Sequence, residues 1–305
     1  MLDRSSKRCY ICFMNTLSIQ QRTKIIQLLV EGNSIRSITR ICDVSKNTVT
    51  KLLVQVGQAC MNFHNEKVVN VNASRVQCDE IWAFVNSKEK NTTQEMKEKG
   101  NGDTWTWVGI DADTKLVVSW FVGNRSAETA SIFMNDLAQR LSSRVQLTTD
   151  GHLPYLQAVR EAFNNDIDFA QLVKVYGSSY DSNNATERKY SPSKLQSINK
   201  IPISGNPDEV HVSTSFVERQ NLTMRMHMRR FTRLTNAFSK KLENHMYAVA
   251  LHFVYYNWCK IHKTLRVTPA MEAKLTKTVM KIEDIANLAT HTAPKTRGSY
   301  KKKAA

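Results

Sequence analysis

The sequence predicts an α/β protein in which a mixed sheet flanked by helices follows a small all-helical domain. Three observations predict this fold class. Residues 17–57 carry apolar side chains at helical spacing. Residues 76–176 read in the order β-β-β-α-β-α-β. Helical spacing then returns at Ser213 and continues, with breaks, to Leu288.

The segment 17–57 predicts three short helices. Gly32 and Asn33 are suited to end the first, and Ser34 and Ser45 to cap the second and third. The third opens with polar and basic residues of the kind that a helix-turn-helix protein places in the major groove of DNA: Lys46, Asn47, Thr48, Thr50 and Lys51. A plain three-helix bundle with a solvated polar face would show the same pattern. We predict a helix-turn-helix DNA-binding domain over 17–60, joined by a linker over 61–74.

Alternating apolar residues predict the strands. The first strand covers residues 75–85 and contains Asp79, and a charged loop, 87–103, follows it. The later elements come in order: strands over 104–110 and 116–122 joined by a turn, a helix capped by Ser126, a strand over 145–149 that ends at Asp150, a helix over 155–163 and a strand over 169–176. These elements and the helices after Ser213 predict one α/β domain over 75–288.

Three segments differ in composition from the rest. Residues 177–212 are rich in Ser, Asn, Pro, Lys and Asp, which predicts a mobile loop inserted before the last helices. The leader 1–16 and the basic tail 289–305 are expected to be disordered.

The charge balance favours a polyanionic partner. The chain has 43 Lys and Arg against 27 Asp and Glu, a net charge of +16, and only five of the positive charges lie in the tail. Nucleic acid is the commonest polyanion for such a protein, and a membrane surface is the weaker alternative. No apolar run approaches the ~20 residues of a membrane helix, and the leader lacks the apolar segment of a signal peptide. We expect a cytoplasmic, nucleoid-associated protein.

The cysteines do not predict a metal centre. Cys9 and Cys12 form half of a zinc site, but no second pair lies nearby, so zinc is not expected there. The remaining four are expected to be small core residues in a reducing compartment: Cys42, Cys60, Cys78 and Cys259.

Three acidic residues are the candidate catalytic and metal-binding residues: Asp79, Asp150 and Glu218. Two carboxylates on strands and one on a helix can collect hard oxygen ligands for a divalent cation, which suits phosphodiester chemistry. Each has a plainer alternative. Alternation along the strand would direct either Asp79 or its neighbour Glu80 away from a shared site. Asp150 with Gly151 could form an ordinary turn, and Glu218 could close a capping box with Ser215.

At these residues the chain resembles the DDE transposases of bacterial insertion sequences, in particular the insertion-sequence-one family. The resemblance runs from about residue 15 to 288 and is most specific over 76–82 (VQCDEIW), 146–151 (QLTTDG) and 213–226 (STSFVERQNLTMRM). It implies a ribonuclease-H-like fold and a DDE triad of Asp79, Asp150 and Glu218 that binds two Mg²⁺ (or Mn²⁺) ions. It also implies strand cleavage at the ends of an element and strand transfer into target DNA.

The same resemblance implies double-stranded DNA as partner, both element ends and target, and a homo-oligomer assembled on DNA. The interval from Asp150 to Glu218 is long for the family, and the predicted loop 177–212 accounts for it. Arg225 and Arg229 follow Glu218 at spacings close to one helix face, which suits contacts with DNA phosphates. A helix-turn-helix regulator that has lost catalysis, and a nuclease without strand transfer, remain as alternatives.

Overall fold

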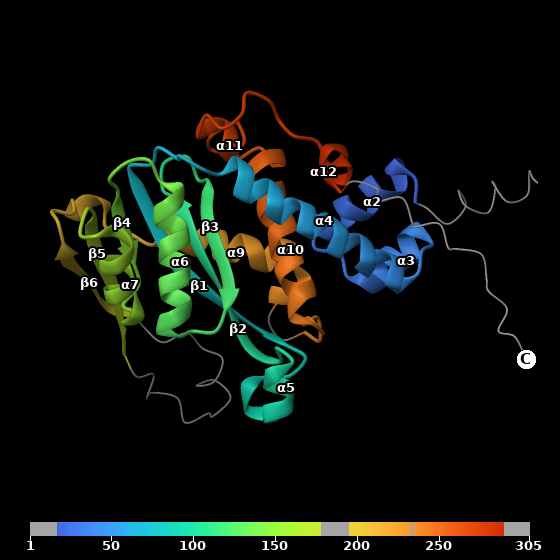
Figure 1. Ribbon diagram of the computed structural model, residues 1–305, viewed down its shortest axis with the longest axis horizontal. Helices are drawn as coiled ribbons and strands as arrows, with labels where there is room; N and C mark the ends of the chain where they lie inside the picture. Colours follow the sequence, from blue (N-terminus) through green and yellow to red (C-terminus); the bar gives the residue numbers. More distant parts are fainter. Residues whose placement is uncertain (1–16, 178–194, 233–234, 290–305) are drawn as a thin grey trace, which may run out of the picture.

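The protein is built around one six-stranded mixed sheet (Figure 1). The computed structural model describes residues 17–177, 195–232 and 235–289. The strand order is β3-β2-β1-β4-β5-β6, and β1 pairs in parallel with β4, as β4 does with β5. The strands are β1 (Arg75–Val85), β2 (Gly102–Asp111), β3 (Val117–Gly123), β4 (Gln146–Thr149), β5 (Asp168–Tyr176) and β6 (Leu195–Ser204).

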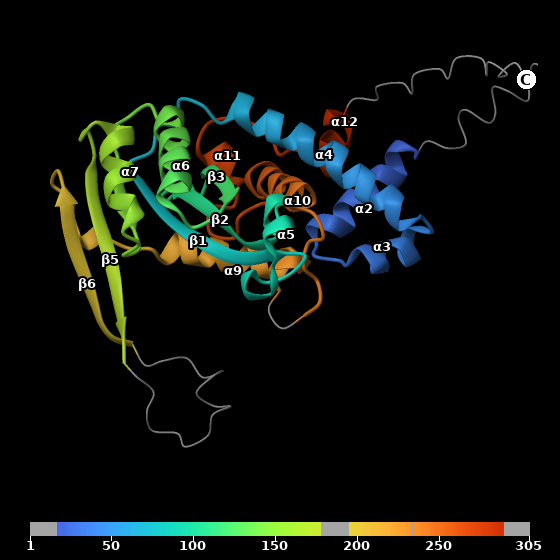
Figure 2. The ribbon, with the colours of Figure 1, turned by 60° about the horizontal axis from the view of Figure 1, so that its bottom comes forward.

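Helices cover both faces of the sheet. On one face α6 (Ala127–Arg140) and α7 (Pro154–Phe163) bury Phe133 and Tyr155 against side chains of β1 and β2. On the other face α9 (Ser215–His227) buries Val217 and Met224 against Ile81 of β1. Figure 2 shows α6 and α7 on one side of β1 and α9 on the other. The predicted order of strands and helices from β1 to β5 is present.

The three predicted N-terminal helices are present as α2 (Ile19–Val30), α3 (Ile35–Cys42) and α4 (Lys46–Lys67). Their N-caps are Ser18, Ser34 and Ser45, and each serine hydroxyl accepts a hydrogen bond from the backbone N–H three residues later. Gly32 follows α2 with a φ of 76°, a conformation that glycine adopts without strain.

The predicted linker 61–74 differs from the structure, because α4 continues to Lys67. Cys60 and His64 extend its buried face at a spacing of four residues, and Nε2 of His64 lies 3.2 Å from the carbonyl oxygen of Val118. The polar residues around His64 conceal this face in the sequence. Tertiary contacts therefore lengthen the helix beyond the end that apolar periodicity predicts.

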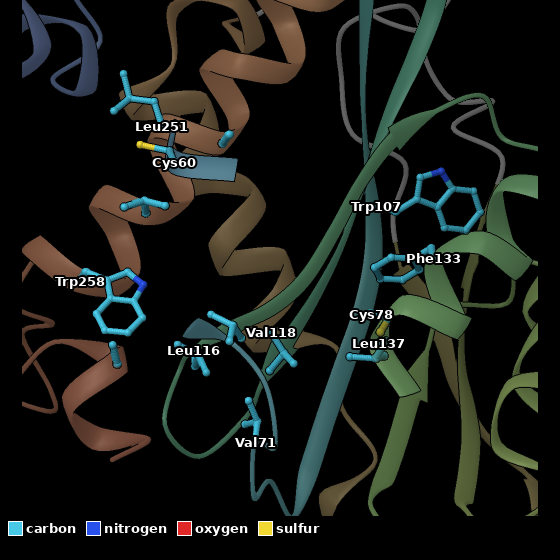
Figure 3. Packing of buried hydrophobic residues seen from close by; sticks show 14 of the residues in the cluster. Cys60, Val71, Cys78, Trp107, Leu116, Val118, Phe133, Leu137, Leu251 and Trp258 are labelled. Atoms are coloured by element: carbon cyan, nitrogen blue, oxygen red, sulfur yellow. The ribbon is translucent and has the colours of Figure 1, made fainter. Parts of the chain in front are cut away.

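Helix α4 also joins the two predicted domains. It packs on α10 (Leu242–Val254), where a Cβ added at Gly57 would overlap the Cβ of Tyr247. Figure 3 shows buried side chains from both parts of the chain, among them Cys60, Leu251 and Trp107, which belong to one continuous cluster. Segment 17–60 thus shares its core with the rest of the protein.

The C-terminal region forms further helices around α10. They are η4 (Tyr255–Cys259), which is a π-helical turn, α11 (Pro269–Glu272) and α12 (Ile282–Leu288). Within the described ranges, no helix is long and apolar enough to cross a membrane. The leader with Cys9 and Cys12, and the tail from Thr290, lie outside the described residues.

Two predicted loops contain regular structure. In 87–103 there are η1 (Glu89–Asn91) and α5 (Gln94–Glu98). The described part of 177–212 contains β6, which pairs antiparallel with β5, and η2 (Glu209–His211), so the prediction of a loop throughout was wrong. The reason is that β6 is exposed along almost its whole length, so backbone pairing and not burial holds it. Residues 178–194 of this predicted loop lie outside the described residues.

Candidate functional site: an acidic cluster between two central strands

The parallel pairing of β1 with β4 brings two of the predicted acids together. Cys78 pairs with Thr149 at the end of β4, so Asp79 and Asp150 are the next residues along the two strands. Carboxylate oxygens of Asp79, Glu80 and Asp150 all lie within 4.8 Å of one another. We call these three residues the acidic cluster.

Glu80 belongs to the cluster although strand alternation predicts that one of the two neighbours points away. The alternation itself is present: Asp79 contacts Asn221 of α9, and Glu80 faces Arg125 on the other side of the sheet. Because β4 stops at Thr149, Asp150 lies at the open end of the strand and is reached from both faces. The plainer alternative, that alternation keeps one of the two neighbours out of a shared site, therefore does not hold.

The Glu80 carboxyl is buried and only partly neutralised. Its side chain is 1% exposed, and Oε2 lies 3.5 Å from Nη2 of Arg125. Within the described residues Oε1 accepts no hydrogen bond of good geometry, although the Tyr155 hydroxyl interacts with this carboxyl. Burial, and next the charge of Asp150, raise the pKa of Glu80 to about 8, against the opposing effect of the Tyr155 hydroxyl.

Asp79 is held in place by two donors. Nδ2 of Asn221 donates to Oδ2 at 2.9 Å, and the backbone N–H of Glu80 donates to Oδ1 at 2.8 Å. Burial and the charge of Asp150 nevertheless raise the pKa of Asp79 to about 6, and the charge of Glu218 adds to this rise. Three carboxyls so close together repel when ionised, which favours a cation between them.

Arg125 forms ion pairs with the acidic cluster, and no local sequence pattern pointed to it. Its Nη2 lies 3.5 Å from Oε2 of Glu80 and 3.6 Å from Oδ2 of Asp150. The guanidinium also lies over the ring of Trp105, 4.8 Å from its centroid. Arg125 directly precedes Ser126, the N-cap of α6, and nothing in that local pattern distinguishes it from a surface arginine.

Glu218 lies beside the cluster but outside it. One of its oxygens accepts a hydrogen bond from the Thr214 hydroxyl at 2.6 Å and forms an ion pair with Lys174 of β5. Thr214 is the N-cap of α9 and Ser215 is already helical, so the alternative of a capping box between Ser215 and Glu218 is not formed. Two members of the predicted triad therefore lie together, and the role of Glu218 as the third stays a prediction.

The buried side chain of Gln77, which sequence reasoning missed, fixes the start of α9. Its Oε1 accepts hydrogen bonds from the backbone N–H groups of Phe216 (2.8 Å) and Val217 (3.2 Å). Gln77 anchors the start of α9 and Asn221 its second turn, both against β1. These two contacts determine which side of α9 faces the acidic cluster.

Of the residues predicted to contact DNA at the start of α4, three have exposed side chains and two have hydroxyls that bond within the helix. Lys46, Asn47 and Lys51 are exposed at the start of α4. The Thr48 hydroxyl lies 2.9 Å from the Ser45 hydroxyl, and the Thr50 hydroxyl donates to the Lys46 carbonyl at 3.0 Å. DNA binding by this helix stays a prediction.

The two predicted arginines do not share one helix. Arg225 is in the last turn of α9, but the helix ends at His227, and Arg229 begins η3 (Arg229–Phe231). The prediction that both follow Glu218 on one helix face was wrong, because the chain turns at Met228, whose φ and ψ are −122° and 105°.

The acidic cluster fits a hard divalent cation. Carboxylate oxygens are the ligands that Mg²⁺ and Mn²⁺ prefer, and Oε1 of Glu80 offers a buried oxygen at this position. Burial, and next the charge of Asp150, raise the pKa of both Asp79 and Glu80, and a divalent cation bound at the cluster would oppose this rise by favouring the ionised carboxylates.

No protein-family model matches the chain, and no curated protein does either. Among solved structures, the chain is similar to a cryo-EM structure of a piggyBac transposase synaptic complex with hairpin DNA. The two are 8% identical, and the match covers 89% of this chain and 69% of that one with a TM-score of 0.40. A similarity at that TM-score is too low to carry a functional conclusion.

Proposed function

We propose that the protein is a DDE-type DNA transposase that cleaves DNA at the ends of an insertion sequence and transfers the strand into target DNA. The acidic cluster is the observation that carries this proposal. It gathers two carboxylates from the middle of β1 and one that directly follows β4, on a protein with a net charge of +16. The resemblance of its three sequence segments to insertion-sequence transposases supplies the reaction class.

Asp79 and Asp150 would hold Mg²⁺ or Mn²⁺, with Glu80 as a third oxygen donor from the opposite face of the sheet. Glu218 would add a ligand if its ion pair with Lys174 opened. When bound, such an ion supplies Lewis acidity toward a phosphodiester and stabilises the charge on the leaving oxygen. Two ions would serve the two sides of the displacement.

The chain's own residues prepare this site. Asn221 orients the Asp79 carboxylate, and the Gln77 contacts hold α9 against the strand. Arg125 is 38% exposed in its side chain, so its guanidinium can turn from Glu80 and Asp150 toward a phosphate oxygen. Helix α4 would supply recognition of duplex DNA through Lys46, Asn47 and Lys51, and we propose a DNA-assembled oligomer.

A catalytically silent DNA-binding regulator is the second candidate, and one observation favours it. Arg125 and Lys174 already pair with Glu80, Asp150 and Glu218, so protein cations partly neutralise the carboxylates without a metal. A protein that had lost catalysis could keep this arrangement as an internal salt-bridge network.

The test is cleavage and strand transfer on labelled DNA that carries the flanking element ends, with Mg²⁺ or Mn²⁺. Wild type is compared with Asp150→Asn, Glu80→Gln and Glu218→Gln, and with Glu161→Gln on the exposed surface of α7 as control. We expect nicking at the ends by wild type and the control, and loss of nicking with retained gel-shift binding in Asp150→Asn.

Comparison of the variants also identifies which residue is the third metal ligand. Loss of nicking in Glu218→Gln with activity retained in Glu80→Gln would assign the third ligand to α9, and the reverse result would assign it to β1. Binding to the ends without cleavage by wild type would establish the regulator instead.

A further inference from the structure

A row of aromatic side chains leads away from the acidic cluster along one face of the sheet. We call Trp105, Trp82, Phe84 and Phe238 the aromatic row. Trp82 and Phe84 follow Glu80 on β1 at intervals of two residues, so all three side chains point to the same face. Trp105 of β2 is the cross-strand partner of Trp82.

Three of the rings follow one another in contact, and Trp105 is placed next to Trp82 by strand pairing. The centroids of Trp82 and Phe84 are 5.7 Å apart, and those of Phe84 and Phe238 are 4.9 Å apart. Phe238 reaches this face because Ser239 bridges to Val85 at the end of β1, which aligns its chain segment with the strand. At the other end, Arg125 joins Trp105 to Glu80 and Asp150 of the acidic cluster.

Three of these rings lie outside the hydrophobic core, and Trp105 packs against its edge. All four are half-buried, whereas the neighbouring Trp107 is 0% exposed. Within the described residues, Trp82, Phe84 and Phe238 belong to neither of the two large hydrophobic clusters and do not pack against them. Partly exposed rings therefore lie side by side on this face of the sheet, where burial in the core does not account for them.

Positive charges accompany the rings at both ends. The Lys88 ammonium lies 5.8 Å from the centroid of Trp82, and that of Lys240 lies 4.6 Å from the centroid of Phe238. Arg125 covers Trp105 in the same way. Aromatic faces with adjacent cations are what an unpaired nucleic-acid strand requires, because bases stack on the rings and phosphates meet the cations.

We propose that the aromatic row binds unpaired bases of a DNA strand whose neighbouring phosphate lies at the acidic cluster. From Glu80 to Phe84 the strand advances four residues, about 13 Å at the usual rise, which is enough for a few nucleotides. Base stacking of this kind is tolerant of sequence, so the row selects for unpaired bases and not for a base sequence. Only the position of that phosphate rests on the proposed function; strand binding does not.

The test measures binding of the full-length protein to three fluorescent probes of equal length by anisotropy, in EDTA so that no cleavage occurs. The probes are oligothymidylate, an abasic strand with the same phosphates, and a duplex. We expect oligothymidylate to bind at least about fivefold more tightly than the abasic strand, the lower limit for one stacked base. Equal affinities for these two probes in wild type would overturn the proposal without any variant.

Variants then locate the effect. Trp82→Leu keeps an apolar side chain but removes the ring, and it should abolish most of the preference for bases. Leu153→Ala, at a side chain that is 73% exposed elsewhere on the surface, is the matched control and should leave the preference unchanged. If Trp82→Leu melts at the same temperature as wild type and retains the full preference for bases, the bases stack elsewhere and the assignment to the aromatic row is wrong.

The lysines have a separate signature. Lys88→Ala with Lys240→Ala should weaken oligothymidylate and the abasic strand by the same factor, because both carry the same phosphates. Lys46→Ala with Lys51→Ala, in helix α4, should weaken the duplex and leave the preference for bases intact. If the wild-type protein prefers unpaired bases but does not cleave element ends, only the transposase proposal is refuted. If it cleaves the ends but shows no preference for bases, only the base-binding role of the aromatic row is refuted.

Discussion

Nδ2 of Asn221 donates a hydrogen bond of 2.9 Å to Oδ2 of Asp79, and this bond ties helix α9 to strand β1 at the acidic cluster. Glu218 precedes Asn221 by three residues, so the two side chains lie on the same side of α9. The Asn221 bond thus holds Glu218 near the cluster, while Lys174 holds its carboxylate outside.

Removing Lys174 should therefore allow the Glu218 carboxylate to bind a divalent cation at the acidic cluster. Lys174→Met frees the carboxylate, and we expect divalent-cation affinity to rise about two- to fivefold, because partly exposed ion pairs contribute up to ~1 kcal/mol. Titration calorimetry with Mn²⁺ measures this change. Lys200→Met on the neighbouring strand β6 is the control. An unchanged affinity in Lys174→Met would mean that Glu218 is not a ligand.

Stability without divalent cations should fall as the pH rises from about 4.5 to 8. Burial and Asp150 raise the pKa of Glu80 to about 8, and that of Asp79 to about 6, so the folded state binds more protons than the unfolded state across this range. Glu80→Gln removes the larger contribution. In urea unfolding at pH 5 and 8, the variant should match wild type at pH 5 and exceed it at pH 8. A variant no more stable than wild type at pH 8 contradicts the burial of a charged Glu80.

Mg²⁺ or Mn²⁺ should stabilise the protein more at pH 8 than at pH 5, since protons compete with the ion for the carboxylates. Thermal melting with and without the ion, at matched ionic strength, measures the effect, and EDTA should reverse it. We expect Asp150→Asn to lose the stabilisation and Asp113→Asn, outside the cluster, to keep it. Equal stabilisation in both variants would mean that the ions bind elsewhere.

Gly57→Ala should destabilise the protein strongly. The added methyl overlaps the Cβ of Tyr247, where α4 crosses α10, and overpacking of this kind costs about 1–3 kcal/mol or more. Chemical denaturation measures the loss. Gln55→Ala, exposed on the same helix, is the control and should change stability little. A stable Gly57→Ala protein would show that the two helices can separate without cost.

The start of α4 should contribute phosphate contacts to duplex binding. Lys46→Ala with Lys51→Ala should weaken binding to all duplex sequences alike and reduce the slope of log affinity against log salt by about two, one for each lysine. Lys277→Ala is an exposed control distant in sequence. An unchanged slope would exclude this helix end from the DNA interface.

Local sequence determined most of the elements. Ser34, Ser45 and Ser126 are the N-caps of helices, as the sequence predicts. Alternation of apolar residues predicted the bounds of strands β1 to β5 to within a few residues. These features depend on neighbours in the chain, through capping hydrogen bonds and a periodic apolar face, and so can be read from it. Helix α4 beyond Cys60 and strand β6 escaped this reading, because distant partners stabilise them.

The site divides in the same way. The sequence by itself determined that Asp79 lies within a strand, that Asp150 follows another strand and that the protein is strongly basic, since apolar alternation and charge are properties of the chain. Only the tertiary structure decided that β1 pairs with β4 beside these acids, that Glu80 joins them, that Arg125 pairs with Glu80 and Asp150, and that Lys174 pairs with Glu218. Those contacts join side chains from different elements, and their geometry follows from where β4 ends and how α9 is anchored to β1.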